Sequence, residues 1–185
     1  IQGLYAPGST FKMIVAIAGL YHGVIDTNTS HSCNGKIALG DRLYHCWKNN
    51  GHGVMNVENA IKESCDVFFY EISKKIGIDK IAEVAKDFGL GKTYEIFLEN
   101  QKKGIVPSKK WKKDNIGESW YPGETLISAI GQGFVLTNPL QLATMTSIIA
   151  SNGKKIEPNI LQNRGAINFK KLDKENFNYS DSFNP

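Results

Sequence analysis

A serine and a lysine three residues apart, Ser9 and Lys12, stand at the start of an apolar run from Met13 to Tyr21. Residues three apart share a face of a helix, so the amine of Lys12 can reach the hydroxyl of Ser9. A serine hydroxyl is a poor nucleophile until a base takes its proton. The positive end of the helix dipole and burial beside an apolar helix both favour the neutral amine that such a base must be. The pair therefore predicts a serine nucleophile with a lysine as its general base.

A second pair with the same spacing, Ser151 and Lys154, shows how little four residues establish alone. An Asn-Gly dipeptide lies between its members and is typical of a helix end, where the two side chains do not share a face. Ser64 and Asp66 add to the case for a site, because they interrupt an apolar helical pattern and are costly to bury without partners. The alternative is that both face solvent while Cys65 lies in the core.

Several motifs, in one order along the chain, resemble those of the penicillin-binding transpeptidases, in particular the elongation-type class B enzymes. The resemblance covers about residues 3 to 160. Ser9 and Lys12 match the active-serine motif, and Ser64-Cys65-Asp66 matches the second motif, with Asp66 where Asn is more usual. The other matching segments are Ala6-Pro7-Gly8, Trp47-Lys48, Gly51-His52-Gly53, Trp120-Tyr121-Pro122-Gly123, Gly131-Gln132-Gly133-Phe134 and Thr137-Asn138-Pro139-Leu140-Gln141-Leu142-Ala143.

The resemblance implies an acyl transfer in which each matched residue has a role. Ser9 would attack the carbonyl of a D-Ala-D-Ala stem peptide and release D-Ala, while Lys12 takes the hydroxyl proton. Ser64 would relay a proton toward the leaving amine, and Asp66 would hydrogen-bond Lys12 or the substrate. An amine from a neighbouring stem peptide would then take the acyl group, and β-lactams would acylate Ser9 in the same way. The turn expected to bind substrate is formed by Gly131, Gln132 and Gly133.

The third motif of the family, Lys-Thr-Gly or Lys-Ser-Gly, does not occur in the 185 residues, and the nearest match, Lys92-Thr93-Tyr94, lacks the glycine. In the family this motif lies on a strand that lines the substrate groove and supplies one oxyanion N–H. The expected fold is therefore α+β, mainly the helical part of a penicillin-binding-protein and serine β-lactamase-like transpeptidase domain, with most of the sheet outside this chain. Residues 1–185 are expected to be a partial transpeptidase domain that is weak or inactive by itself.

The resemblance also implies partners and a location. The family acts on peptidoglycan stem peptides, binds β-lactam antibiotics, and needs no cofactor for catalysis. It works at the periplasmic face of the bacterial inner membrane, with a membrane glycan polymerase and an elongation complex that maintains cell shape. An anchor would lie outside this chain, whose longest apolar run has nine residues. The alternatives are a non-catalytic penicillin-binding sensor or inactive relic fragment and, less in keeping with the motifs, a serine β-lactamase.

Helical periodicity and capping residues predict the elements that must position these groups. The expected helices are 9–22, 56–76, 79–88 and 138–152. The first would carry Ser9, and the second would carry Ser64 and Asp66 near its middle. Between them lies a turn-rich loop subdomain, 26–55, with short strand-like pieces. Residues 90–123 are expected to be loops.

All three cysteines and one of the four histidines lie in or near the loop subdomain: Cys33, Cys46, His52 and Cys65. Three thiolates and an imidazole are a common structural zinc set, although gaps of twelve, five and twelve residues do not match a compact finger. Zinc would tie Cys65, and with it Ser64, to a loop with few apolar residues. A disulfide between Cys33 and Cys46 is the second interpretation, because the family works in an oxidising space. In the third interpretation Cys65 is a small core residue and His52 is a residue of a turn.

Composition narrows the remaining classes of protein. Hydrophobic residues make up 41% and charged residues 22% of the chain, which is a globular composition. The formal charge of +4 is concentrated in six lysines between Lys102 and Lys113, a patch that could bind an anionic partner. Gly104 and Pro107 interrupt the patch, so it is expected to be a solvated loop, and no nucleic-acid partner is expected.

Overall fold

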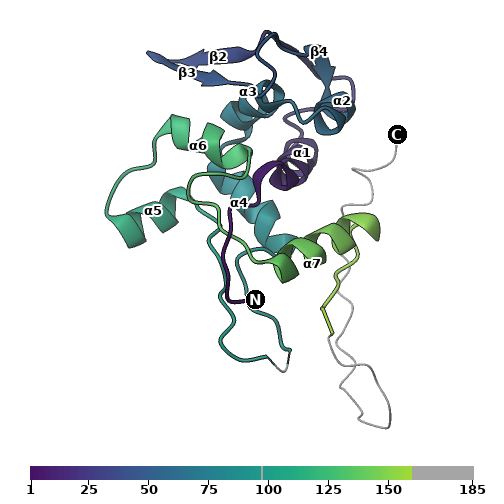
Figure 1. Cartoon of the computed structure of the whole chain (residues 1–185), viewed down its shortest axis with the longest axis vertical. Coiled ribbons are helices and arrows are strands. Elements are labelled where there is room, and N and C mark those ends of the chain that lie inside the picture. Colours follow the sequence, from purple (N-terminus) through teal and green to yellow (C-terminus); the bar gives the residue numbers. More distant parts are fainter. Residues whose placement is uncertain (97, 160–185) are drawn as a thin grey trace.

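The structure is a computed structural model and describes residues 1–96 and 98–159. Its most apolar helix, α1 (Lys12–Tyr21), packs against α3 (Asp66–Ile76) and α4 (Ile78–Asp87) in the middle of the molecule (Figure 1). Residues 14–18 of α1 are almost fully buried, as expected for a helix without a polar face. Two small antiparallel sheets lie beyond α3, so the predicted α+β class is confirmed.

The residues around Ser9 form a 3-10 turn and not the first turn of an α-helix. This turn, η1 (Gly8–Phe11), leads directly into α1. Gly8 has a φ of +58°, a conformation that glycine adopts at little cost. The α-helix within the predicted range 9–22 therefore begins only at Lys12, and Ser9 is exposed just ahead of it.

The single helix predicted for residues 56–76 is wrong, because the chain forms two helices there. α2 (Val57–Lys62) is capped by Asn56, whose Oδ1 accepts a 2.9 Å hydrogen bond, and α3 begins only at Asp66. Ser64, between them, has a left-handed φ of +52°. The break changes the direction of the chain, so Ile61, which the helical period places in the core, is 43% exposed.

The loop subdomain consists of two short strand pairs, of which only β2–β3 is a hairpin, and they lie above α3 and α6 in Figure 1. β1 (Ser30–Cys33) pairs with β4 (Gly53–Asn56), and β2 (Lys36–Leu39) pairs with β3 (Arg42–His45), both antiparallel. The strand-like pieces expected within 26–55 are thus real strands. Each sheet has only two strands, and such pairs need packing against other elements to be stable.

The prediction of loops throughout 90–123 is also wrong. Ser108 caps α5 (Lys109–Ile116) by accepting a 3.0 Å hydrogen bond from Trp111, and α6 (Pro122–Ala129) follows with proline at its first position. Lys112 on α5 is only 1% exposed. Burial acts to lower the pKa of its ammonium, but contacts with Glu124 and Glu118 outweigh burial and raise the pKa. The lysine cluster is therefore not a uniformly solvated loop.

The last predicted helices have counterparts with slightly different ends. α4 starts at Ile78, one residue before the predicted 79–88, and Asp79 in its first turn accepts a 3.0 Å hydrogen bond from Lys109 N at the start of α5. α7 (Pro139–Ala150) lies within the predicted range 138–152 and is capped by Asn138. In the described part of the chain, no helix is both long and apolar enough to cross a membrane.

Candidate active site

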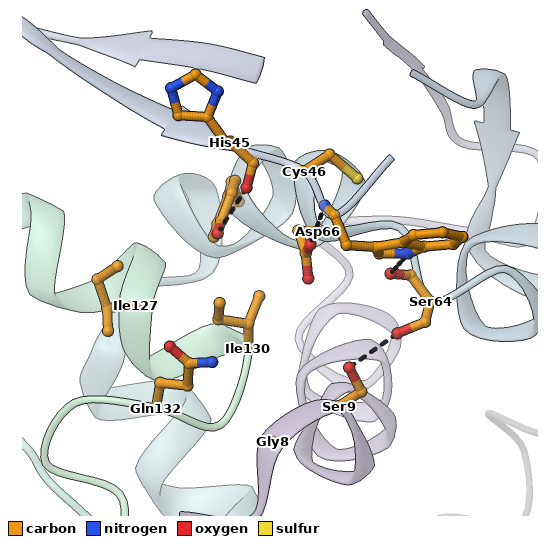
Figure 2. A pocket seen from close by; sticks show the side chains of 11 residues that line it. Gly8, Ser9, His45, Cys46, Ser64, Asp66, Ile127, Ile130 and Gln132 are labelled. Atoms are coloured by element: carbon orange, nitrogen blue, oxygen red, sulfur yellow. Dashed lines mark hydrogen bonds between the residues drawn. The ribbon is translucent and has the colours of Figure 1, made fainter. Parts of the chain in front are cut away.

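The four residues predicted to carry the chemistry, Ser9, Lys12, Ser64 and Asp66, come together beside the break between α2 and α3. Ser64 Oγ donates a 2.8 Å hydrogen bond to Ser9 Oγ (Figure 2). Lys12 Nζ in turn donates to Ser64 Oγ at 3.0 Å and to Asp66 Oδ1 at 2.6 Å. A continuous chain of hydrogen bonds thus connects an exposed serine hydroxyl to a buried lysine.

Lys12 reaches Ser9 by way of Ser64, whereas the sequence spacing predicts a direct contact. Its Nζ also donates to the Ser64 carbonyl at 2.8 Å, which gives three acceptors for the three protons of an ammonium. The side chains of Lys12 and Asp66 are 2% and 13% exposed, so water screens this ion pair little. The geometry fits a resting state with charged Lys12, neutralised by Asp66, and with Ser9 accepting a hydrogen bond.

Trp47 belongs to one of the matching motif segments but has no role predicted from the sequence. In the structure it stabilises the break between α2 and α3. Its indole Nε1 donates to the carbonyls of Ser64 at 3.0 Å and Glu63 at 3.2 Å. Its backbone N–H donates to Asp66 Oδ2 at 2.9 Å. The Ser64 carbonyl therefore accepts from both Lys12 and Trp47, and these bonds stabilise a φ that a residue other than glycine seldom adopts. The 61% exposure of Trp47 puts it at the rim of the site.

A cavity of about 700 Å³ opens in front of Ser9. Its walls come from η1, from the end of β3, from the α2–α3 break and from α6 with the turn after it. The lining residues are Gly8, Ser9, His45, Cys46, Trp47, Ser64, Asp66, Tyr70, Ile127, Ile130 and Gln132. Figure 2 shows Ile130 and Gln132 on the side of the cavity opposite Ser64. The volume is sufficient for a short peptide end.

The predicted Gly131-Gln132-Gly133 turn contributes to the site in three different ways. Gln132 lines the cavity beside Ser9. Gly131 lies against the backbone of Gly8, whose N–H donates 2.9 Å to the Gly131 carbonyl, and a side chain at 131 would overlap the Gly8 backbone. Gly133 does not line this cavity but a neighbouring one. Gly131 thus supports the serine turn and is not among the residues that line the cavity.

Cys33, Cys46, His52 and Cys65 form one cluster directly behind the site, in which the three cysteines are buried and His52 is half-buried. Their ligand atoms all lie within 4.8 Å of one another, and His52 Nδ1 is 3.6 Å from Cys33 Sγ and 3.5 Å from Cys46 Sγ. Ligands at 2.0–2.3 Å from a tetrahedral zinc ion lie about 3.5–3.8 Å apart, so the cluster fits such an ion. All three thiols are free, and burial raises the pKa of the Cys65 thiol. The disulfide interpretation is therefore not the state of this structure.

Fold and site together have the arrangement of an active-serine domain, in which a helix-borne lysine and a second serine lie beside an exposed serine. Residues 1–182 match the family model described as penicillin binding protein transpeptidase domain. The chain therefore belongs to the penicillin-binding protein transpeptidase family.

Named relatives and solved structures agree with this membership. The peptidoglycan D,D-transpeptidase MrdA of Acinetobacter baumannii is 38% identical over 88% of this chain, which spans 24% of that relative. Penicillin-binding protein 2 from Helicobacter pylori has a TM-score of 0.88 and 37% identity, over 97% of this chain and 34% of that one. A complex between penicillin-binding protein 2 and MreC from the same organism gives a TM-score of 0.81 and 39% identity, over 85% of this chain and 29% of that one. The resemblance to the elongation-type enzymes is confirmed.

Proposed function

We propose that this chain is the active-serine part of a peptidoglycan D,D-transpeptidase, which cross-links stem peptides through an acyl-enzyme on Ser9. The observation that carries the proposal is the hydrogen-bonded series from Ser9 Oγ through Ser64 Oγ to Lys12 Nζ, at the edge of a cavity that can hold a peptide end. The related MrdA protein, named for this activity, supports it.

Acylation requires the Ser9 proton to leave through Ser64. The hydrogen bonds of the structure run in the resting direction, so Lys12 must first release a proton to solvent and both hydroxyls must turn. Ser9 then gives its proton to Ser64 Oγ while Ser64 passes its own proton to the neutral amine of Lys12. The bond between Ser9 Oγ and the substrate carbonyl carbon then forms, and the bond from that carbon to the terminal D-Ala nitrogen breaks. The departing nitrogen takes a proton back from Lys12 along the same path. Asp66 remains a carboxylate and balances the charge of Lys12 while it is protonated.

Transfer to the second peptide repeats these steps in reverse. The amine of a neighbouring stem peptide attacks the ester carbon, so that a carbon–nitrogen bond forms and the bond to Ser9 Oγ breaks. The proton lost by the amine passes through Ser64 and Lys12 and finally returns to Ser9. A β-lactam acylates Ser9 by the same first half, but its leaving nitrogen stays tethered and the ester persists.

The 185-residue chain by itself is proposed to be weakly active or inactive. It contains Ser9 and Lys12 but no Lys-Thr-Gly, the family motif expected to supply one of the two oxyanion N–H groups. Loss of one oxyanion donor costs about 100- to 1,000-fold in rate in other enzymes. We therefore regard residues 1–185 as part of a transpeptidase domain.

Covalent labelling with a fluorescent β-lactam tests the proposal. The full-length protein should take up the label, and mass spectrometry of its peptides should locate the label on Ser9. The isolated 185-residue chain should label at least about 100-fold more slowly, since it lacks the third motif. The Ser9→Ala variant should show no label. The nearby Thr10→Ala variant is its matched control and should be labelled like the parent protein.

Other outcomes identify the alternatives. Fast labelling followed by release of hydrolysed drug would indicate a β-lactamase. Stable labelling without any cross-linking of stem peptides would indicate a penicillin-binding sensor. Absence of label in the full-length protein would contradict the proposal outright.

We further propose that the full-length protein works at the periplasmic face of the bacterial inner membrane, in an elongation complex that includes a glycan polymerase. Penicillin-binding protein 2 of Helicobacter pylori, which forms a complex with MreC, supports a partner of this kind. A link to cell shape and to antibiotic resistance follows from the same function, because a cross-linking enzyme is the target that β-lactams acylate.

Structural zinc is proposed for the cluster of Cys33, Cys46, His52 and Cys65, and catalysis needs no cofactor. The separations of 3.5 and 3.6 Å between sulfur and imidazole nitrogen support tetrahedral coordination. Zinc would convert three buried thiols into thiolates and stabilise both strand pairs. Because Cys65 lies between Ser64 and Asp66, the same ion would fix the position of the second motif.

Metal analysis and unfolding experiments test the proposed zinc site directly. We expect one zinc per chain, and we expect Cys33→Ser to lose the metal and about 3 kcal/mol or more of unfolding free energy. His45→Ala is the matched control, because His45 is exposed and outside the cluster, and it should retain both metal and stability. Purified protein with no zinc and three freely titrating thiols would rule the site out, as would a disulfide between Cys33 and Cys46.

A further inference from the structure

A second cavity adjoins the active site on the side of the β2–β3 hairpin. It has a volume of about 390 Å³ and lies between this hairpin and α6. The residues that line it are Arg42, Tyr44, Tyr121, Gly123, Glu124, Ile127, Ser128, Gly133 and Phe134. Ile127 belongs to the walls of both cavities, so the two are neighbours across one side chain. A chain that enters the second cavity can therefore continue over Ile127 toward Ser9.

The second cavity offers hydrogen-bond donors that have no partner within the described residues. The guanidinium of Arg42 forms no ion pair or hydrogen bond there, and it lies 5.4 Å from the ring centroid of Tyr44. The Tyr44 hydroxyl and the buried Ser128 hydroxyl likewise have no hydrogen-bond partner in the described part of the chain. A cation and hydroxyls among aromatic side chains favour a ligand that carries a carboxylate.

The only carboxylate in the cavity wall does not compete for these donors. Glu124 Oε1 accepts from Lys112 at 2.6 Å, and its Oε2 accepts from the Tyr121 backbone N–H at 2.8 Å. Lys112 is buried and further lies 4.5 Å from the Tyr121 ring centroid. The negative charge of Glu124 is thus compensated inside the protein, whereas the positive charge of Arg42 is available to a ligand.

The wall itself is rigid where Tyr44 meets α6. The Tyr44 hydroxyl lies directly over Gly123, where a side chain would overlap it. The Tyr44 ring also packs edge-on against Tyr70, at 5.9 Å between centroids, and Tyr70 lines the active-site cavity. Tyr121, 58% exposed, forms the rim. An aromatic groove fixed in this way is preorganised for an extended ligand.

We propose that the second cavity binds the acceptor stem peptide, with a carboxylate of that peptide on Arg42 and Tyr44 and its amine directed over Ile127 toward the acyl group on Ser9. This inference rests on the proposed transpeptidase function. A transpeptidase must hold two peptides, and the cavity in front of Ser9 receives the one that becomes the acyl group. The adjoining cavity has the complementary charge for the anionic peptide that brings the amine.

The test is the partition of the acyl-enzyme between an amine and water, measured in the full-length protein. The acceptor is a stem tetrapeptide that lacks the terminal D-Ala, so that it can accept but cannot donate. Arg42→Ala should lower the ratio of cross-linked to hydrolysed product about ten-fold or more, because a hydrogen bond to a charged group is lost. Tyr44→Phe should lower it less. The rate of β-lactam acylation of Ser9 should stay the same in both variants.

Lys36→Ala is the matched control, since Lys36 is an exposed cation on the same hairpin that lines neither cavity. Lys36→Ala should not change the ratio of cross-linked to hydrolysed product. With an acceptor whose carboxylates are amidated, Arg42→Ala and the parent protein should give the same ratio. Calorimetric binding of the tetrapeptide should weaken in Arg42→Ala by the same factor, independently of catalysis.

Several results would overturn the subsite. One such result is that Arg42→Ala changes neither the ratio of cross-linked to hydrolysed product nor the binding of the tetrapeptide. Another is that Arg42→Ala only raises the KM of the donor peptide, which would place the donor in the second cavity. If β-lactams do not label Ser9 in the parent protein, the proposed function fails. The binding experiment still shows separately whether the second cavity holds the tetrapeptide through Arg42.

Discussion

Replacement of Lys12 by Met is expected to slow β-lactam acylation of Ser9 by about 100- to 10,000-fold, the range that general-base catalysis contributes. Met has a similar length and no proton acceptor, so Ser64 could no longer pass on the proton that it takes from Ser9. The measurement is the second-order acylation constant of the full-length protein, with Ser9→Ala as the zero reference. Lys154→Met is the control, because Lys154 has the same spacing from Ser151 but is exposed and takes no part in the hydrogen bonds of Lys12.

The Lys12 variant also leaves Asp66 without its ion-pair partner. Removal of one member of a buried pair costs about 3 kcal/mol of unfolding free energy. The double variant Lys12→Met with Asp66→Asn removes both charges, so it should recover most of this stability and none of the acylation rate. Recovery of acylation in the double variant, or an unchanged rate in the single one, would show that Lys12 is not the base.

Replacement of Gly131 by Ala is expected to destabilise the protein by at least about 3 kcal/mol and to abolish most of the acylation. One part of the cost, about 1–2 kcal/mol, is the left-handed φ of +71°. The other part is the overlap of the new Cβ with the backbone of Gly8, next to the nucleophile. Any shift that relieves the overlap moves Ser9 away from Ser64.

Gly117→Ala separates these two costs. Gly117 has a φ of +82° at the end of α5, but a Cβ there meets nothing within 4 Å. It should lose only the conformational part, about 1–2 kcal/mol, with unchanged acylation. Thermal unfolding and labelling of both variants provide the comparison, and equal losses in the two would contradict the role given to the contact between Gly131 and Gly8.

Elements with strong local signals could be predicted from the sequence. α1 has an apolar residue at almost every position, and α7 starts with Asn138 and Pro139, so periodicity and capping suffice for both. Local signals do not suffice for α5, because the lysine-rich segment has no apolar stripe. Its stability depends on Lys112, which is buried against Glu124 and two aromatic rings that lie later in the chain.

The residue types of the site and their grouping can be read directly from the amino-acid sequence: a serine three residues before a lysine, a second polar motif, a glycine turn, and three cysteines with one histidine. The position of Ser64 between Ser9 and Lys12, in contrast, depends on contacts between distant parts of the chain. Residues 63–65 contain neither glycine nor proline, so nothing local ends the helix there. The break exists because Lys12 and Trp47, distant in the chain, both donate to the Ser64 carbonyl and together outweigh the cost of a left-handed serine.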